Sequence, residues 1–219
     1  MNYTANILLA VGAIPSMSID PEEICDFVSS ANALLINLGT LSNERKDSMV
    51  KAIDTACTQH KPWVLDPVFV NRSPLRLALA HQLVKQKPSV VRANAEEIKA
   101  LFNDYSTTNK LAQKIETVIA RTGQPDIVSD GNATVQIFNG HELMSRVTGL
   151  GCAMSALVTA FASVTDNTLD ATTSALLVMG IAGEIAAESA NGPGRLQNSI
   201  LDTLYNLNGD QIIQRSNIE

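Results

Sequence analysis

Short apolar runs alternate with helix-patterned segments through the first half of the chain, and this alternation constrains the fold more than any other feature. The runs lie at Ala33 to Leu38, Trp63 to Leu65 and Ser89 to Arg92. Each run is bounded by turn residues or by the end of a helical segment, as buried strands are. Helical spacing fills the segments from Asn43 to His60 and from Pro74 to Lys85. The alternation predicts a parallel sheet whose strands are buried on both faces by covering helices.

The rest of the chain modifies this pattern. After a strand that ends near Ala120 come two further short runs, Asp126 to Ser129 and Thr134 to Phe138. The turn Asp130-Gly131-Asn132 between them predicts a hairpin. From Gly151 onward the spacing is helical, with Gly192-Pro193-Gly194 as a bend between the last two helices. We therefore expect one α/β domain over residues 1–219, with a mostly parallel central sheet flanked by helices.

Composition limits the kinds of partner. Of the 219 residues, 45% are apolar and 17% are charged, which is typical of a globular protein. The net charge of −6, with no basic block, argues against binding of nucleic acid. The longest small and apolar run, Ala175 to Gly183, is too short to span a membrane, and the start lacks the basic region of a secretory signal. We expect a cytoplasmic protein that binds neither nucleic acid nor membranes.

The cysteines do not form a framework. Cys25, Cys57 and Cys152 are widely separated, with no CxxC pair and no histidine at metal-ligand spacing. A disulfide network or a structural zinc site is therefore not expected. Cys25 and Cys57 lie among apolar residues with helical spacing, which predicts inert core thiols. Cys152 differs because it follows two glycines.

The segment Thr148-Gly149-Leu150-Gly151-Cys152 runs directly into a long apolar helix. Glycine lets the backbone approach a ligand closely, and the start of a helix presents unpaired N–H groups with a partial positive charge. The segment could therefore hold a phosphoryl oxygen or a developing anion. It could equally be a tight turn that packing requires, so the pattern alone leaves both interpretations open.

Polar side chains follow the predicted strands, at the edge where parallel α/β sheets bind their ligands. Asp66 could bind Mg²⁺ or, with the proline after it, simply start a turn. Glu97 lies three residues after Asn94, so it could complete a capping box or bind Mg²⁺ directly or through water. Arg92 would place a delocalised positive charge near phosphate, and Thr122 offers a hydroxyl at another strand end.

Several segments occur in a fixed order along nearly the whole chain. They are Thr-Ala-Asn at 4–6, Gly-Ala-Ile-Pro-Ser-Met at 12–17, Ile-Asn-Leu-Gly-Thr-Leu at 36–41, Trp-Val-Leu-Asp-Pro-Val at 63–68, Val-Arg-Ala-Asn-Ala-Glu-Glu-Ile at 91–98, Thr-Gly at 122–123, Asn-Gly-His at 139–141 and Val-Thr-Gly-Leu-Gly-Cys-Ala at 147–153. In this order they resemble the hydroxyethylthiazole kinase family. The resemblance implies a three-layer ribokinase-like fold and the ATP-dependent phosphorylation of 4-methyl-5-(2-hydroxyethyl)thiazole in thiamine salvage.

The resemblance also implies where the two substrates bind. The thiazole alcohol would lie against Met17, Gly39 and Gly149. ATP would contact a second set of residues, Arg92, Asn94 and Thr122. The family resemblance further implies a homotrimer with active sites at the subunit interfaces.

Metal and catalytic groups follow from the same resemblance. Asp66 and Glu97 would serve Mg²⁺. Gly149, Gly151 and Cys152 would form the catalytic anion hole, with the cysteine where many ribokinase-like enzymes place an aspartate base. A thiol is a poor base at neutral pH unless its surroundings favour the thiolate. We therefore expect catalysis to rest mainly on positioning and on charge neutralisation by Mg²⁺, Arg92 and backbone amides.

Three features depart from the family pattern. The chain begins inside the helix that follows a thiazole-binding segment of the family, Ala93 replaces a glycine, and Phe69-Val70-Asn71 replaces a small, glycine-rich stretch. The shortened start favours one alternative, a catalytically weak relative that binds nucleotide or thiazole and acts as a structural or regulatory subunit. A second alternative is a ribokinase-like enzyme with another substrate, such as a hydroxymethylpyrimidine kinase or a dehydratase. A third is an α/β domain whose glycines and acids are all structural.

Overall fold

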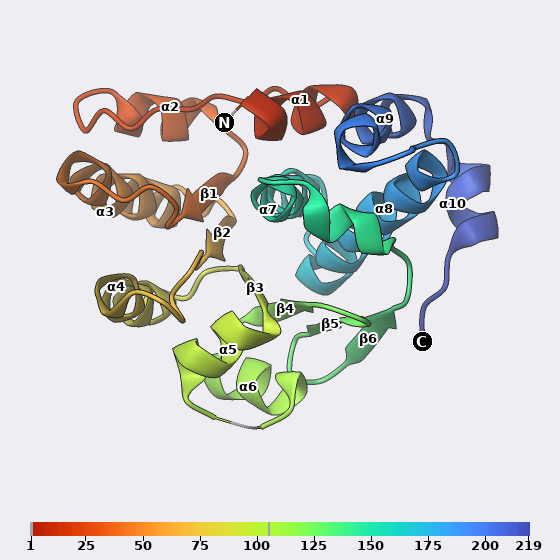
Figure 1. The fold of residues 1–219 in the computed structure, drawn as a ribbon. Coiled ribbons are helices and arrows are strands. Elements are labelled where there is room, and N and C mark those ends of the chain that lie inside the picture. Colours follow the sequence, from red (N-terminus) through yellow and green to blue (C-terminus); the bar gives the residue numbers. More distant parts are fainter. Residues whose placement is uncertain (1, 105) are drawn as a thin grey trace.

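A six-stranded sheet forms the centre of the computed structural model, which describes residues 2–104 and 106–219 (Figure 1). The strands are β1 (Leu34–Asn37), β2 (Trp63–Asp66), β3 (Val90–Asn94), β4 (Val118–Thr122), β5 (Asp126–Ser129) and β6 (Thr134–Ile137), and they are adjacent in this order. Strands β1 to β4 pair in parallel. Strand β5 is antiparallel to β4 and forms the predicted hairpin with β6. The predicted α/β class and mostly parallel sheet are confirmed.

Helices cover both faces of this sheet (Figure 1). One face carries α3 (Asn43–Thr58), α4 (Pro74–Val84), α5 (Ala95–Phe102) and α6 (Thr108–Ile115). The other face carries α7 (Leu150–Ala162) and α8 (Thr168–Ala187), with α1 (Asn2–Ala10) and α9 (Pro193–Asn206) packed outside them. The remaining helices are α2 (Ile24–Ser30) on α3, α10 (Gly209–Arg215) on α8, and the 3₁₀-helix η1 (Glu142–Arg146) that precedes α7. The arrangement is the expected three layers.

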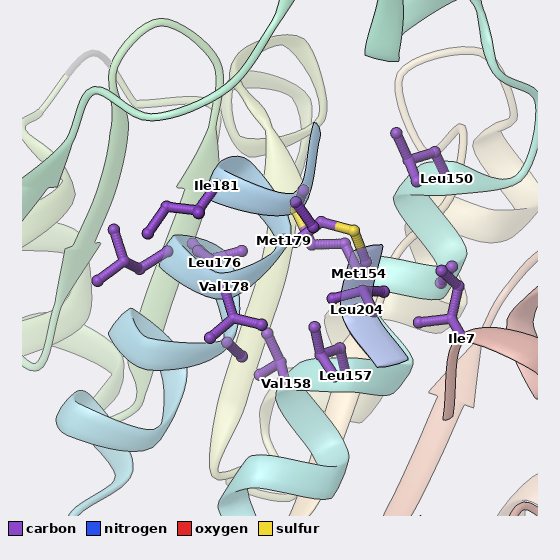
Figure 2. Close-up of a cluster of buried hydrophobic side chains, with 14 of the residues drawn as sticks. Ile7, Leu150, Met154, Leu157, Val158, Leu176, Val178, Met179, Ile181 and Leu204 are labelled. Atoms are coloured by element: carbon purple, nitrogen blue, oxygen red, sulfur yellow. The ribbon is translucent and has the colours of Figure 1, made fainter. Parts of the chain in front are cut away.

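The larger core lies between the sheet and helices α7 and α8 (Figure 2). Leu157 of α7 and Leu176 and Met179 of α8 are completely buried there. Helix α8 is long and apolar enough to cross a membrane, but 67% of its most apolar window is buried inside the protein. Its apolar sequence is therefore explained by its place in the core.

Two expectations about burial are wrong. Strand β1 is not buried on both faces, because it lies at the edge of the sheet and leaves Leu34 and Leu35 half-buried. Cys57 is exposed and is no core thiol. The buried stripe of α3 passes through Ile53 and Ala56, and the next residue projects about 100° further round the helix.

The C-terminal region contains more helix than the sequence predicts. The predicted bend is present but ends at Gly192, and Pro193 already opens α9, because the first turn of a helix does not use the N–H group that proline lacks. Neither η1 nor α10 was expected from the helical spacing. Both are short, at five and seven residues, and short helices leave a weak periodic pattern.

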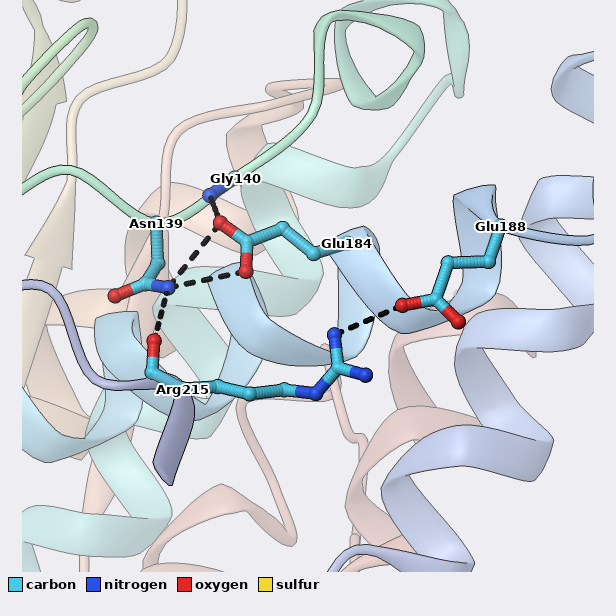
Figure 3. A network of polar contacts seen from close by, with 5 residues as sticks. All are labelled: Asn139, Gly140, Glu184, Glu188 and Arg215. Atoms are coloured by element: carbon cyan, nitrogen blue, oxygen red, sulfur yellow. Dashed lines mark hydrogen bonds and ion pairs between the residues drawn. The ribbon is translucent and has the colours of Figure 1, made fainter. Parts of the chain in front are cut away.

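A polar network fastens α10 to α8 (Figure 3). Glu184, a charged residue in the apolar helix α8, accepts hydrogen bonds from Asn139 Nδ2 at 3.0 and 3.1 Å and from the backbone N–H of Gly140 at 2.8 Å. Asn139 Nδ2 also donates to the carbonyl oxygen of Arg215 at 2.8 Å, and the Arg215 side chain donates to Glu188 at 2.8 Å. The network thereby anchors the loop that leads from β6 toward α7.

Candidate active site

The carboxyl ends of the parallel strands meet at one edge of the sheet, beside the start of α7. Asp66 is the last residue of β2, Asn94 ends β3 and Thr122 ends β4. Glu97 lies in the first turn of α5, directly after β3. Gly149 is the N-cap of α7, which packs on β1 and β2. The fold thus gathers residues that the sequence spreads over 84 positions, from Asp66 to Gly149.

Asp66 is a buried carboxylate at the centre of this edge, with 1% of its surface exposed. One of its oxygens accepts a hydrogen bond from Asn37 Nδ2 at 2.7 Å. The pKa of Asp66 is raised to about 6. Burial is the main cause and the charge of Glu97 adds to it, while the charge of Arg92 and hydrogen bonds from Ser155 and Asn37 act against the rise. The Asp66 carboxylate is therefore mostly ionised at neutral pH and protonates in mild acid.

Glu97 is held by backbone amides. Its two carboxylate oxygens accept from Phe69 N at 2.8 Å and from Asn94 N at 3.0 Å, while Asn94 Oδ1 accepts from Glu97 N at 2.9 Å. The capping box that the sequence left open is therefore present. It ties the loop after β2 to α5 and fixes the direction of the Glu97 carboxylate.

Asp66 and Glu97 suit a magnesium ion. Both are buried oxygen donors, and the charge of Glu97 is one cause of the raised pKa of Asp66, so a cation shared by the two would relieve their repulsion. Residues 2–104 and 106–219 contain no cluster of three or more His, Cys, Asp or Glu side chains that could hold a metal by itself. Two carboxylates match Mg²⁺ that takes its other ligands from water and phosphate.

Arg92 crosses from β3 to the start of α7. Its Nη2 donates to Thr122 Oγ1 at 2.8 Å, and the Thr122 hydroxyl lies 3.4 Å from the carbonyl oxygen of Ala93. Arg92 Nη1 lies only 3.1 Å from the place that a Cβ on Gly151 would occupy. The Arg92 Nε is buried without a hydrogen-bond partner. Gly151 thus allows a guanidinium group to lie directly against the first turn of α7.

The first turn of α7 leaves backbone amides open. Gly149 has a φ of +84°, a left-handed conformation that favours glycine. Ala153 N donates back to Gly149 O at 2.9 Å, whereas the N–H groups of Gly151 and Cys152 have no acceptor within the described part of the chain. Amides in this position, together with the positive end of the helix, can bind an anion.

Cys152 lies in this first turn and is half-buried. Burial raises the pKa of the Cys152 thiol, and the charge of Asp66 adds to the increase. A hydrogen bond with Asn37 and the charge of Arg92 act in the opposite direction without cancelling it. Cys152 is therefore a neutral thiol at physiological pH, and its place at a helix start does not convert it into a base.

A cavity of about 1050 Å³ opens beside the carboxylates. Its lining includes Met17, Gly39, Asn37 and Cys152, and helix α7 contributes Ala156 farther along. Gly39 N donates to Asn37 Oδ1 at 2.8 Å, which places the loop after β1 against the same asparagine that binds Asp66. The cavity wall and the carboxylate cluster therefore share Asn37, and Cys152 also lines the cavity. Gly149 does not line this cavity.

The sequence did not single out Asn37 or Ser155 as site residues. Asn37 ends β1 in the same way as Asp66 ends β2, so its position at a strand's carboxyl end was a usable signal. Ser155 lies one helical turn after Gly151, and its hydroxyl donates to the Gly151 carbonyl at 3.3 Å. Its proximity to Asp66 depends on how α7 packs on β2, which no local pattern predicts.

Buried carboxylates, a half-buried guanidinium and open helix amides at the ends of parallel strands define an α/β protein whose site suits phosphoryl transfer. A solved structure of a ribokinase-like superfamily protein from Enterococcus faecalis V583 has the same fold. The TM-score is 0.72 over 93% of this chain and 81% of that chain, at 12% sequence identity. The fold is therefore ribokinase-like.

The particular family follows from closer relatives. Residues 1–210 match the Hydroxyethylthiazole kinase family. The chain is 41% identical to a hydroxyethylthiazole kinase from Akkermansia muciniphila, over 97% of this chain and 85% of that protein. A solved structure of a hydroxyethylthiazole kinase protein from Pyrococcus horikoshii OT3 has a TM-score of 0.97 at 40% identity, covering 100% of this chain and 89% of that chain. The chain belongs to the hydroxyethylthiazole kinase family.

Proposed function

We propose that this protein transfers the terminal phosphoryl group of ATP to the hydroxyl of 4-methyl-5-(2-hydroxyethyl)thiazole, giving the phosphate ester and ADP. Family membership supports the reaction. The observation that carries the proposal is the convergence of Asp66, Arg92 and the open amides of α7 beside a cavity large enough for a small alcohol. Phosphoryl transfer needs little covalent help from the protein, so positioning and charge are the main requirements.

The thiazole alcohol would occupy the cavity. Met17 and Gly39 line it on the side of the N-terminal segment and the loop after β1, and Cys152 lines it on the side of α7. A ring bound between these walls directs its hydroxyethyl group toward the amides of Gly151 and Cys152. Holding the two reactants in line in this way supplies a large part of the rate enhancement of such enzymes.

ATP would bind over the ends of β3 and β4, in contact with Arg92, Asn94 and Thr122. Asp66 and Glu97 would hold Mg²⁺, which would supply positive charge to neutralise part of the phosphate charge. The Arg92 guanidinium adds a second positive charge next to the α7 amides. Together these groups would stabilise the charge that develops on the transferred phosphoryl group.

Cys152 has a minor part in this scheme. Its pKa is raised, so its thiol does not remove the proton of the substrate hydroxyl at neutral pH. Its backbone N–H would join those of Gly151 and Gly149 in holding the transferred group. The thiol itself would contact the hydroxyethyl group and help to orient it.

Assembly into a homotrimer would complete the cavity. The segment that lines its outer side exposes apolar side chains, with Ile14 at 95%, Met17 at 46% and Ile19 at 44%. Covering these groups with a neighbouring subunit would remove apolar surface from water and enclose the thiazole. We assign the protein to the cytoplasm as one kinase domain that acts on small molecules and binds no nucleic acid or membrane.

The proposal is tested by measuring ADP release with Mg-ATP, with and without the thiazole alcohol. We expect release that depends on the alcohol and is much weaker with a hydroxymethylpyrimidine. Ligand-dependent thermal stabilisation without ADP release would instead identify a binding protein with no kinase activity. Faster release with the pyrimidine would assign another substrate to the same fold.

A further inference from the structure

Asp126 is a buried carboxylate that the scheme above does not use. Among the described residues, the buried acidic side chains are Asp66, Glu97 and Asp126, the last with 9% of its surface exposed. A buried carboxylate is costly unless it is hydrogen-bonded or paired with a positive charge. Asp126 opens β5, and its position close to the end of β4 brings it to the same edge of the sheet as the proposed ATP site.

The first contact of Asp126 closes a turn. Its Oδ1 accepts from Gly123 N at 2.7 Å, across the short connection between β4 and β5. Thr122, the last residue of β4, directly precedes that glycine. The hydrogen bond therefore fixes the backbone immediately after Thr122, the residue whose hydroxyl contacts Arg92.

The second interaction of Asp126 is a longer-range electrostatic attraction. Burial raises the pKa of Asp126, while the Gly123 hydrogen bond and the charges of Arg92 and Arg121 act against it. Asp126 thus lies close enough to Arg92 for their opposite charges to attract. Arg92 in turn donates to Thr122 Oγ1 at 2.8 Å and lies against Gly151. From Asp126 the link runs through the Gly123 hydrogen bond to the adjoining Thr122, and from Thr122 through Arg92 to the first turn of α7.

We propose that Asp126 is a positioning residue for ATP: it holds the Thr122–Gly123 turn and, through Thr122, keeps the Arg92 guanidinium against Gly151. The inference rests on the proposed function, which assigns Arg92 and Thr122 to ATP. A purely structural Asp126 would stabilise the turn and affect both substrates alike. A positioning Asp126 affects ATP selectively.

The test compares Asp126→Ala and Asp126→Asn in the full chain, with ATP affinity measured by calorimetry in the presence of Mg²⁺ and KM measured for each substrate. For Asp126→Ala we expect ATP affinity to fall ~10-fold, while the KM of the thiazole alcohol changes less than ~2-fold. Asp126→Asn should recover most of this loss, because an amide oxygen can still accept from Gly123 N.

Asp130 provides the matched control at the other end of β5. It is an aspartate whose Oδ1 accepts from Asn132 N at 2.8 Å and Ala133 N at 2.7 Å in the hairpin turn. We expect Asp130→Ala to lower the melting temperature and to leave ATP affinity within ~2-fold of wild type. The control separates loss of a turn hydrogen bond from loss of ATP positioning.

Three outcomes overturn the inference: folded Asp126→Ala that binds ATP as wild type does, loss of affinity for both substrates to the same extent, or an Asp130→Ala variant that loses as much ATP affinity as Asp126→Ala. If Asp126→Ala does not fold, Asp126→Glu provides the test. Its displaced carboxylate should weaken ATP binding and leave the KM of the thiazole alcohol unchanged. Calorimetry needs no turnover. Wild-type protein that binds ATP without phosphorylating the thiazole alcohol therefore refutes the proposed function and still tests Asp126, whereas wild-type protein that binds no ATP refutes both.

Discussion

The edge of the sheet at which the parallel strands end has two halves that differ in structure. At the ends of β1 and β2 the protein is open: a cavity of about 1050 Å³ lies beside Asp66, and Met17 in its wall is 46% exposed. At the end of β4 it is closed: Thr122 is buried, and its hydroxyl accepts from Arg92. The closed half is the one that we assign to ATP, and the open half is the one that we assign to the thiazole.

The chain completes only the closed half of the site by itself. Hydrogen bonds within one chain fix the closed half, so its groups are preorganised for a charged ligand. The open half exposes apolar surface and so depends on its ligand and on a neighbouring subunit for closure. Asp66 and Arg92 lie between the two halves, and both halves of the proposed site use their charges.

The largest effect should come from Asp66, where the halves meet. Asp66→Asn removes a charge proposed to hold Mg²⁺ and keeps a side chain of the same size, so we expect kcat to fall by ~10³-fold with the fold intact. Steady-state ADP release at saturating Mg-ATP measures this. Asp54→Asn, on the exposed side of α3, is the control and should behave as wild type. An Asp66→Asn variant with more than ~10% of wild-type kcat would show that the carboxylate is not part of the catalytic machinery.

The next largest effect should come from the charge of Arg92, and it should exceed the effect of the Cys152 thiol. Arg92→Ala should lower kcat/KM ~100-fold, because the guanidinium neutralises phosphate charge. Cys152→Ser should lower it less than ~10-fold, because the Cys152 thiol has a raised pKa and does not act as the base. Both variants are measured side by side by ADP release. Complete loss in Cys152→Ser with little loss in Arg92→Ala would reverse the roles.

A smaller effect should separate the two halves by substrate. Met17→Ala removes a side chain from the cavity wall and should raise the KM of the thiazole alcohol ~10-fold, with the KM of ATP almost unchanged. Thr122→Val keeps the shape of the side chain and removes its hydroxyl, so it should raise the KM of ATP instead. Steady-state kinetics with each substrate varied in turn would show this crossover. If each variant changed both KM values equally, the division into an open and a closed half would be wrong.

The smallest effect concerns stability and pH. The pKa of Asp66 is raised from 3.8 to about 6, so the folded state favours the neutral acid. Stability from this group is fully present below pH 3.8 and is lost as pH rises through 6. We expect metal-free wild type to lose ~1 kcal/mol between mildly acidic and mildly basic pH in urea denaturation, relative to Asp66→Asn. If the free energy of unfolding varied with pH in the same way in wild type and in Asp66→Asn, the pH dependence would come from a group other than Asp66.

The sequence predicts the part of the site that lies at the carboxyl ends of the parallel strands, where such sheets bind their ligands. Apolar runs that end in Asp66, Arg92 and Thr122 predict that these residues meet, because parallel strands share one edge. The structure brings them together. Met17 and Gly39 were assigned only through the family resemblance, since nothing in their local pattern indicates a cavity wall.

The remaining residues depend on tertiary packing. Ser155 reaches Asp66 because α7 packs on β2, and Asp126 reaches Gly123 because β5 turns back antiparallel to β4. Phe69 adopts a left-handed conformation with a φ of +58°. Its amide donates to Glu97, so the left-handed conformation is kept here in spite of the bulky side chain.

The central claim is that the strand ends and the amides of α7 act on one magnesium nucleotide directed at a small alcohol. Phosphorus NMR of wild-type protein with ATP, Mg²⁺ and the thiazole alcohol tests it most directly. We predict a new phosphate monoester signal that grows in step with ADP and disappears when the metal is chelated. Inorganic phosphate formed in its place, or no change in the ATP signals, would contradict the claim.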